Sequence, residues 1–261
     1  MSVSNKYSES LGKLNKCIWV ILIPILLDSL DLMFNWLIYK IKYIPTPNIF
    51  KIKIGLMHTP ASVRFLLEDF PTSIFSLKNN MVSGLLTNID LFTICLAITV
   101  FLVISYFTGV YLVTLSKIGE EDFSLKEVFM LDNRIWRKLF LYRLITIIPI
   151  ILFMIDRTFL VTAFILIFFV YVEYSIILDK GSILTNLKKG VNFLLNNIGL
   201  TIKIAFYCGL IFSLLSVIVF PIANLGIFGI IVDIIIMAYF GTAFNKTIME
   251  IYRNGQVEIE N

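Results

Sequence analysis

Three polar side chains that could carry proton or cation chemistry lie within a long apolar stretch near the N-terminus. Asp28, Asp31 and Asn35 recur at helical spacing, so a helix places them on one narrow face. Pro24, one turn earlier, frees a backbone carbonyl close to them. An aspartate at the centre of a membrane helix costs ~2.5–3.5 kcal/mol on insertion scales, so we expect this face to look into a helix bundle. There it can line a proton or cation path or a substrate cavity, or it can hold neighbouring helices together.

Depth along the predicted helices indicates further members of an outer polar cluster. Asp31 and Asp233 each lie ~12 Å from the outer end of their apolar segments, and Arg157 lies in a short turn on that side. We therefore expect the two aspartates of the first segment to reach polar groups on other membrane helices. The expected members are Asp28, Asp31, Asn35, Asp233 and Arg157, with Tyr207 as a further neighbour.

A second set of charged residues lies near the opposite ends of the apolar segments. Arg143, Glu173 and Lys203 each fall within ~10 Å of the inner end of a predicted helix. Charged side chains at this depth pair with one another when their helices are adjacent. The sequence therefore predicts an inner ion-pair cluster of these three residues.

Known catalytic patterns match the sequence poorly. The paired Glu120 and Glu121 resemble those of intramembrane metalloproteases, but His58 is the only histidine, so the metal ligands are too few. A lone histidine is itself expected to be incidental. Ser83-Gly84 lacks the flanking glycine and the downstream histidine of a serine intramembrane protease.

The remaining signals for enzyme chemistry are equally incomplete. A dyad of Asp28 and Asp233 lacks the glycine-containing setting of aspartyl sites, and the sequence has no P-loop signature. The three cysteines form no C-x-x-C pair, which argues against a zinc site or a disulfide framework. We therefore expect no catalytic residue, no metal and no cofactor.

Composition indicates a membrane protein. Of 261 residues 58% are hydrophobic and 15% are charged, and the mean hydropathy is +0.89, whereas soluble domains are roughly 25% charged. The net charge of +4 is modest, and no basic cluster extends beyond Arg134, Arg137 and Lys138, so no nucleic-acid partner is expected.

Apolar periodicity predicts an all-α integral membrane protein with six transmembrane helices in one polytopic domain, residues 1–261. Lys and Arg number 15 on the side of the termini and 7 on the other side. The positive-inside rule then places both termini in the cytoplasm of a multi-pass cell-membrane protein. The predicted helices are 18–39, 91–113, 139–155, 159–178, 200–223 and 225–244, with an outer segment over 40–90.

The connecting segments carry helix signals of their own. Thr59-Pro60 predicts a helix through Glu68 in the outer segment. Ser182 is placed to cap an amphipathic interfacial helix whose apolar stripe includes Leu184 and Leu195, with Asn186 on its polar face. Ser124 begins a capping-box pattern for a similar connector helix earlier in the chain.

Features spread across the chain indicate internal repeats and a family resemblance. Aromatic clusters and apolar-proline steps repeat in a way typical of three related helical hairpins. A family resemblance rests on three other features: the N-terminal lysine-bearing helix that leads into a proline-containing segment, the pattern of Gly119, Ser124, Leu125 and Phe129, and the connector GSILTNLKKGVNF of residues 181–193. These features resemble bacterial six-helix domains similar to the membrane domain of glycerophosphoryl diester phosphodiesterases and its uncharacterised relatives. The resemblance implies a six-helix bundle with amphipathic cytoplasmic connectors. Nothing in these residues resembles the soluble phosphodiesterase domain that some relatives carry, so no catalytic residue carries over.

Two classes of function fit these features. The first is a non-enzymatic membrane protein that acts through membrane lipids or partner proteins, in envelope homeostasis. The second is a transport or permease subunit with a polar path lined by the first helix, for which a partner ATPase would supply any nucleotide-driven work. A water-filled route along Asp28, Asp31 and Asn35 favours transport, whereas full packing of this face favours the first class.

Overall fold

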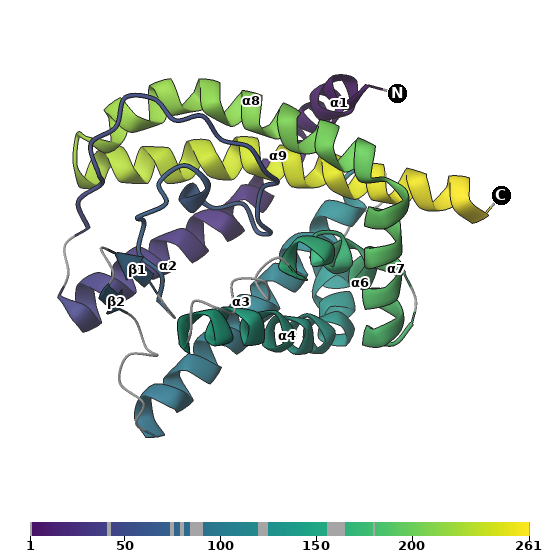
Figure 1. Ribbon diagram of the computed structural model, residues 1–261, viewed down its shortest axis with the longest axis horizontal. Coiled ribbons are helices and arrows are strands. Elements are labelled where there is room, and N and C mark those ends of the chain that lie inside the picture. The colour runs from purple at the N-terminus through teal and green to yellow at the C-terminus, as the bar shows by residue number, and fades with distance from the viewer. Residues whose placement is uncertain are drawn as a thin grey trace. The chain divides into compact units, whose positions relative to one another are not determined.

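A computed structural model describes residues 2–40, 43–73, 76–78, 81–83, 91–119, 125–155, 165–179 and 181–260, and helices dominate them (Figure 1). In the described ranges the one strand pairing is antiparallel and joins β1 (Ser76–Lys78) to β2 (Met81–Ser83). The helices are α1 (Val3–Asn15), η1 (Ile18–Ile21), α2 (Leu22–Tyr39), η2 (Val63–Phe65), α3 (Leu91–Lys117), α4 (Leu125–Ile155), η5 (Ile165–Phe169), α6 (Val172–Leu178), α7 (Ile183–Asn196), α8 (Ile198–Ala223) and α9 (Ile227–Glu260).

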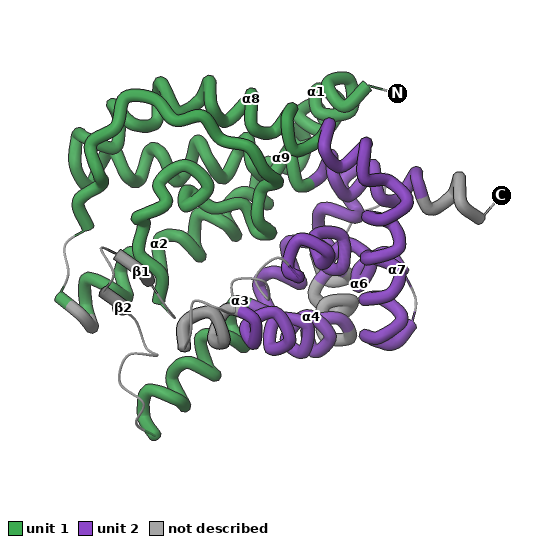
Figure 2. Tube along the Cα trace, in the orientation of Figure 1, with its two compact units in different colours: residues 1–104, 204–245 green, residues 105–203, 246–261 purple. Residues whose placement is uncertain are grey.

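The chain divides into two compact units (Figure 2). Unit 1 comprises residues 1–104 and 204–245, and unit 2 comprises residues 105–203 and 246–261. The boundaries fall within α3, at the start of α8 and within α9, so each of these helices contributes residues to both units.

Four described helical stretches are long and apolar enough to cross a membrane: Ile18–Leu37, Leu91–Lys117, Ile198–Ala223 and Ile227–Gly255. In the first stretch, Ile18–Leu37, apolar side chains are exposed and polar side chains are buried, which is the reverse of a helix in a soluble protein. Leu22 and Trp36 are about 60% and 61% exposed, respectively, whereas Asp28 is only 3% exposed. Exposed apolar side chains around buried carboxylates indicate apolar surroundings.

Two of the six predicted membrane helices are not among these four stretches. The predicted helix 139–155 is the second half of α4, which begins at Leu125 and runs on without a break. Residues 159–164 of the predicted helix 159–178 lie outside the described residues. The described part is interrupted, because residues 165–169 form the 3-10 helix η5 and α6 begins only at Val172. Phe, Val and Tyr dominate residues 168–172, and such side chains lose rotamer freedom in an α-helix.

The predicted helix from Thr59-Pro60 through Glu68 is wrong. Residues 43–73, here called the inserted segment, are largely non-helical and contain only the short η2. Ser62 caps η2 by accepting a hydrogen bond from Arg64 N. Contacts with α2, described below, hold this backbone where local signals alone favour a helix.

The inserted segment packs closely against α8 and α9 within unit 1 (Figure 1). The backbone nitrogens of Lys51 and Lys53 donate to Ser216 Oγ and Ser213 Oγ at 3.0 and 2.9 Å. Gly209 lies against the Lys53 carbonyl so closely that a Cβ atom there would overlap it. Small residues on α8 therefore let an extended backbone lie directly on the helix.

Helix α7 begins where the sequence predicts, with Ser182 Oγ accepting from Thr185 N at 3.3 Å. Its buried face differs from the prediction. Asn186 is fully buried and donates to Ser175 O at 2.8 Å, whereas Leu184 and Leu195 are exposed. The hydrogen bond to Ser175 holds the Asn186 amide inside unit 2, whereas Leu184 and Leu195 lie on the surface.

Candidate functional site

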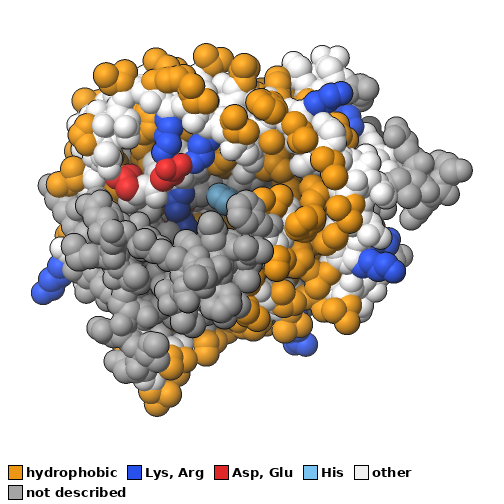
Figure 3. Space-filling view, in the orientation of Figure 1, with side chains coloured by type: hydrophobic (Ala, Val, Ile, Leu, Met, Phe, Trp, Pro, Cys, Tyr) orange, Lys and Arg blue, Asp and Glu red, His pale blue; other side chains and the backbone are white. Residues whose placement is uncertain are grey.

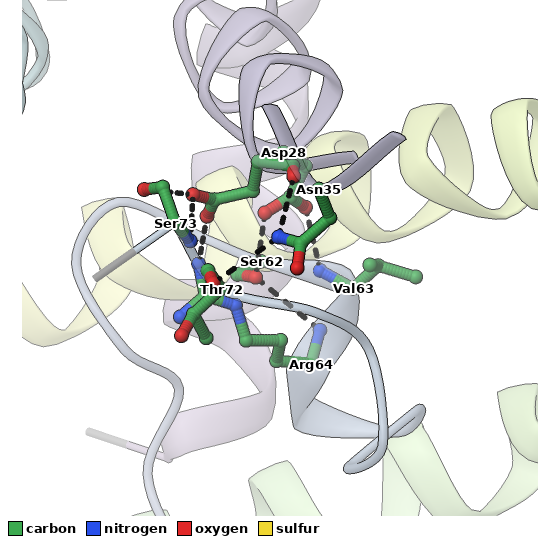
Figure 4. A network of polar contacts seen from close by, with 8 residues as sticks. Asp28, Asn35, Ser62, Val63, Arg64, Thr72 and Ser73 are labelled. Atoms are coloured by element: carbon green, nitrogen blue, oxygen red, sulfur yellow. Dashed lines mark hydrogen bonds and ion pairs between the residues drawn. The ribbon is translucent and has the colours of Figure 1, made fainter. Parts of the chain in front are cut away.

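The polar face of α2 forms a network with the inserted segment, and every member lies in unit 1 (Figure 4). Asp28, Asp31 and Asn35 are 3, 6 and 3% exposed, so this face is closed to the surroundings. Successive turns of one helix bring the three side chains onto the same line. Their partners lie at two places in the inserted segment, 62–64 and 72–73.

Asp28 holds the start of η2. Its Oδ1 accepts a hydrogen bond from Ser62 Oγ at 2.7 Å, and its Oδ2 accepts one from Val63 N at 2.8 Å. Both carboxylate oxygens are thus satisfied by the inserted segment. This arrangement offsets the cost of burying the group.

Asp31 and Asn35 hold the later part of the segment. Asp31 Oδ1 accepts from both N and Oγ of Ser73, at 2.9 and 2.6 Å, and its Oδ2 pairs with the Arg64 guanidinium. Asn35 Nδ2 donates to Thr72 O at 3.1 Å. The network therefore fastens two separated turns of the segment to one helix.

The partners of this face differ from those expected from the sequence. They come from the inserted segment and not from another long helix, and Arg157 lies outside the described residues. Tyr207 instead has ring contacts with Tyr7 and Phe244. Asp233 on α9 is fully buried, and neither of its carboxylate oxygens has a hydrogen-bond partner among the described residues.

Basic and acidic side chains gather in one area of the surface in Figure 3, with hydrophobic side chains above it in the view. Lys51 pairs with Glu68 at 2.5 Å, and Lys53 pairs with the other oxygen of Glu68. The Lys53 ammonium also lies 5.4 Å from the centre of the Phe65 ring. We call Lys51, Lys53, His58 and Arg64 the basic patch.

The surroundings of the basic patch change the pKa of His58, which belongs to it, and of Glu68, which pairs with its lysines. Both lysine partners hold the pKa of the Glu68 carboxyl below its ordinary value. His58 is reachable at the surface, yet surrounding protein and the charges of Arg64 and Lys53 lower the pKa of its imidazole. Its carbonyl accepts a hydrogen bond from Asn245 Nδ2 at 3.0 Å, which ties it to α9. His58 is therefore neutral at physiological pH and lies beside fixed positive charges.

Asp69 closes the beginning of the inserted segment onto its end. Its Oδ1 accepts from Tyr43 Oη at 2.8 Å, and its Oδ2 accepts from N and Oγ of Thr46 at 2.8 and 2.7 Å. Burial, followed by the carboxylate of Asp69, raises the pKa of the Tyr43 phenol. This contact makes the segment a closed loop and not a free linker.

In unit 2 the structure pairs two residues of the predicted inner cluster. Arg143 Nη2 lies 3.9 Å from Glu173 Oε1 and donates to Thr108 Oγ1 at 2.8 Å. Lys203 is exposed and has no hydrogen bond or ion pair with another residue in the described ranges. The inner cluster is therefore a pair, with a threonine in place of the lysine.

Sequence reasoning missed several residues that organise unit 2. Asp179 accepts hydrogen bonds from Ser175, Lys189 and Tyr252, at 2.8, 3.2 and 2.6 Å. Lys246 is almost fully buried and donates to Leu115 O and Ile118 O. A lysine in an otherwise apolar helix is the signal that could have found it, because a cation suits the carbonyl end of a neighbouring helix.

Sequence reasoning also missed the partners of α2. An available signal was the alternation of Lys51 and Lys53 with isoleucines, which indicates an extended chain and not a helix. Another was the presence of Ser62, Arg64 and Ser73 within an apolar segment, since such groups need partners when they are buried.

The geometry is suited to binding and to structural support. Among the described residues, no group of three or more His, Cys, Asp or Glu side chains is arranged to hold a metal ion. In the inserted segment, Lys51, Lys53 and their partner Glu68 keep part of their side chains accessible. Comparisons with protein-family models, curated proteins and solved structures gave no match.

Proposed function

We propose that this chain is a non-enzymatic multi-pass membrane protein that acts through membrane lipids or partner proteins, in envelope homeostasis. The supporting observation is the saturation of the polar face of α2. The carboxylates of Asp28 and Asp31 are bonded to the inserted segment and closed to the surroundings. A polar face whose groups are bonded in this way supports the inserted segment and leaves no open path along the helix.

We propose six membrane crossings with both termini in the cytoplasm. The four long apolar stretches supply four crossings, and the second half of α4 together with residues 159–178 would supply the other two. The asymmetry of 15 against 7 basic residues supports this orientation. The exposed leucines of α7 suit a helix that lies at the inner membrane interface.

In this orientation the inserted segment enters the membrane region from outside. Gly209 lies ~21 Å along α8 from its end at Ala223, and Gly241, which contacts Ala61, lies ~21 Å along α9 from its start. Non-helical backbone is tolerated at such depth only where protein buries it or where it lines a cavity. The hydrogen bonds to α2 and α8 supply that burial, and the basic patch supplies the accessible polar surface.

A second candidate function, a transport or permease subunit, is favoured by Asp233. A buried carboxylate with no hydrogen bond among the described residues is a feature of proton and cation pathways. A partner membrane protein or an ATPase would then be the other subunit of the transport complex. An affinity pull-down from native membranes with lipid analysis separates the two functions, because co-purifying lipid supports the first and a co-purifying ATPase supports the second.

Labelling of single cysteines in a cysteine-free variant tests the membrane topology. A membrane-impermeant maleimide should label Asn48→Cys in intact cells and label Ser4→Cys only after the cells are opened. Both proteins should stay in the membrane pellet after carbonate extraction. Labelling of Ser4→Cys from outside would contradict the proposed orientation, and release by carbonate would contradict a multi-pass membrane protein.

A further inference from the structure

We propose that the basic patch binds the phosphate group of an anionic ligand, either a phospholipid headgroup or a phosphate-bearing solute. The inference rests on the proposed function and names the ligand class through which it would act. Four observations carry it: the unused donors of the lysines, the unpaired Nε of Arg64, the fixed backbone beneath the lysines and the hydrophobic surface beside the patch.

The hydrogen-bonding capacity left over in the patch is donor capacity. Lys51 and Lys53 share the two oxygens of Glu68, so each ammonium retains N–H donors beyond that pairing. The carboxylates of Asp28 and Asp31, in contrast, already accept from the protein through both oxygens. The patch therefore favours a ligand rich in acceptors.

Arg64 gives a second indication of a missing acceptor. Its Nη2 pairs with Asp31, but its buried Nε has no hydrogen-bond partner among the described residues. Unpaired buried donors are rare because each forfeits the hydrogen bonds it makes to water. Arg64 and Lys53 both act electrostatically on His58, and a guanidinium combined with ammonium groups suits the several oxygens of a phosphate better than a single carbonyl.

The backbone beneath the lysines is held rigidly. Hydrogen bonds from Lys51 N and Lys53 N to serines of α8 fix this part of the chain, and the Arg64 side chain is held by Asp31. Charges held in place before binding lose less conformational entropy when a ligand arrives. The patch is thus prepared for an anion before the anion binds.

The surroundings of the patch suit an amphiphile. Ile52 and Ile54 alternate with the lysines and are 74 and 63% exposed, so they present apolar surface on the same stretch of chain. Hydrophobic side chains border the charged area in the space-filling view (Figure 3). A phospholipid offers a phosphate to the lysines and acyl chains to the apolar border.

Binding by the detergent-solubilised full chain tests this proposal. Native mass spectrometry would measure the affinity for dioleoyl-phosphatidylglycerol and for dioleoyl-phosphatidylcholine, and thermal melting would measure the effect of inorganic phosphate against chloride at equal ionic strength. The variants are Lys51→Gln/Lys53→Gln and, as a matched control, Lys203→Gln, which removes an exposed lysine of unit 2. A further variant, Lys51→Arg/Lys53→Arg, retains the charge.

We expect the glutamine pair to weaken phosphatidylglycerol binding by ~10-fold or more, because two charge-assisted hydrogen-bond donors are lost. The arginine pair should retain binding within a few-fold, and Lys203→Gln should match the unmodified chain. Inorganic phosphate that raises the melting temperature of the unmodified chain, but not of the glutamine pair, would identify a soluble ligand. Phosphatidylglycerol binding without a phosphate effect would identify a lipid headgroup.

Equal binding by the glutamine pair and the unmodified chain, for both probes, would overturn the proposal, as would loss of binding in Lys203→Gln to the same degree. Melting and size-exclusion profiles of each variant show whether the fold is intact, and the arginine pair tests the patch if the glutamine pair does not fold. Carbonate extraction is independent of these results. A carbonate-resistant protein that binds neither probe would therefore contradict the ligand assignment and leave the membrane function standing.

Discussion

Oδ1 of Asp31 accepts hydrogen bonds from both the backbone nitrogen and the hydroxyl of Ser73, at 2.9 and 2.6 Å. The two residues are 42 positions apart in sequence, and both are buried. A carboxylate that binds two donors of one residue fixes the position of that residue more firmly than a single bond does. This contact determines where the inserted segment ends its path along α2.

Loss of the Ser73 hydroxyl should destabilise the fold. We expect Ser73→Ala to lower the free energy of unfolding by ~1.5–3 kcal/mol, the range for hydrogen bonds to charged groups. Combined with Asp31→Asn, its effect should be less than additive, because the two residues share one contact. Denaturant unfolding in detergent would measure both, with Ser29→Ala on the exposed side of α2 as the control. Full additivity would show that the two residues do not interact.

Asp28 should tolerate an amide better than an apolar side chain. In Asp28→Asn the oxygen can still accept from Val63 N and the amide can donate to Ser62 Oγ, so we expect a loss near ~1 kcal/mol. Asp28→Ala leaves both partners unpaired, and we expect a loss of ~2–4 kcal/mol. Melting temperatures of the two variants would give the order. A larger loss for the amide would contradict a structural role.

Two glycines of α8 should respond in opposite ways to the same substitution. Gly209→Ala places a methyl group against the Lys53 carbonyl, and we expect a loss of ~1–3 kcal/mol together with displacement of the inserted segment. Gly199→Ala meets nothing within 4 Å and should be neutral or stabilising by up to ~1 kcal/mol. Limited proteolysis near residue 54 would report the displacement. Equal effects of the two substitutions would contradict the close packing.

His58 should make stability depend on pH below its ordinary pKa of 6.5. Its folded pKa is lowered, so the unfolded chain takes up a proton first as the pH falls. The stabilisation from the neutral imidazole is therefore complete above the unfolded pKa and declines through the window between the two pKa values. The difference in melting temperature between the unmodified chain and His58→Gln should shift between pH 7.5 and pH 5. A constant difference would exclude this linkage.

Replacement of Asp233 by an apolar residue of similar size should stabilise the protein. Its carboxylate is fully buried and has no hydrogen bond among the described residues. No hydrogen bond therefore offsets the free energy of removing this group from water. We expect Asp233→Val to raise the free energy of unfolding by ~1–3 kcal/mol. A transport role would show itself as higher stability with lost activity. A large destabilisation would indicate a polar partner for this carboxylate.

The sequence by itself determined the features that depend on local pattern. Apolar periodicity located the four long apolar stretches, Ser182 marked the start of α7, and the spacing of Asp28, Asp31 and Asn35 predicted an inward polar face. These features follow from the preference of each side chain for its surroundings and from the helical repeat. Both can be read from neighbouring residues.

The tertiary structure alone decided which groups meet. A buried carboxylate requires donors, but nothing local to Asp31 identifies Ser73 and Arg64 rather than Arg157 or Tyr207. The same contacts prevent a helix beyond Thr59, and a hydrogen bond to Ser175 turns Asn186 inward on α7. Pairing between distant residues depends on the free energy of the whole packed arrangement, and a single sequence expresses only the need for a partner, not its identity.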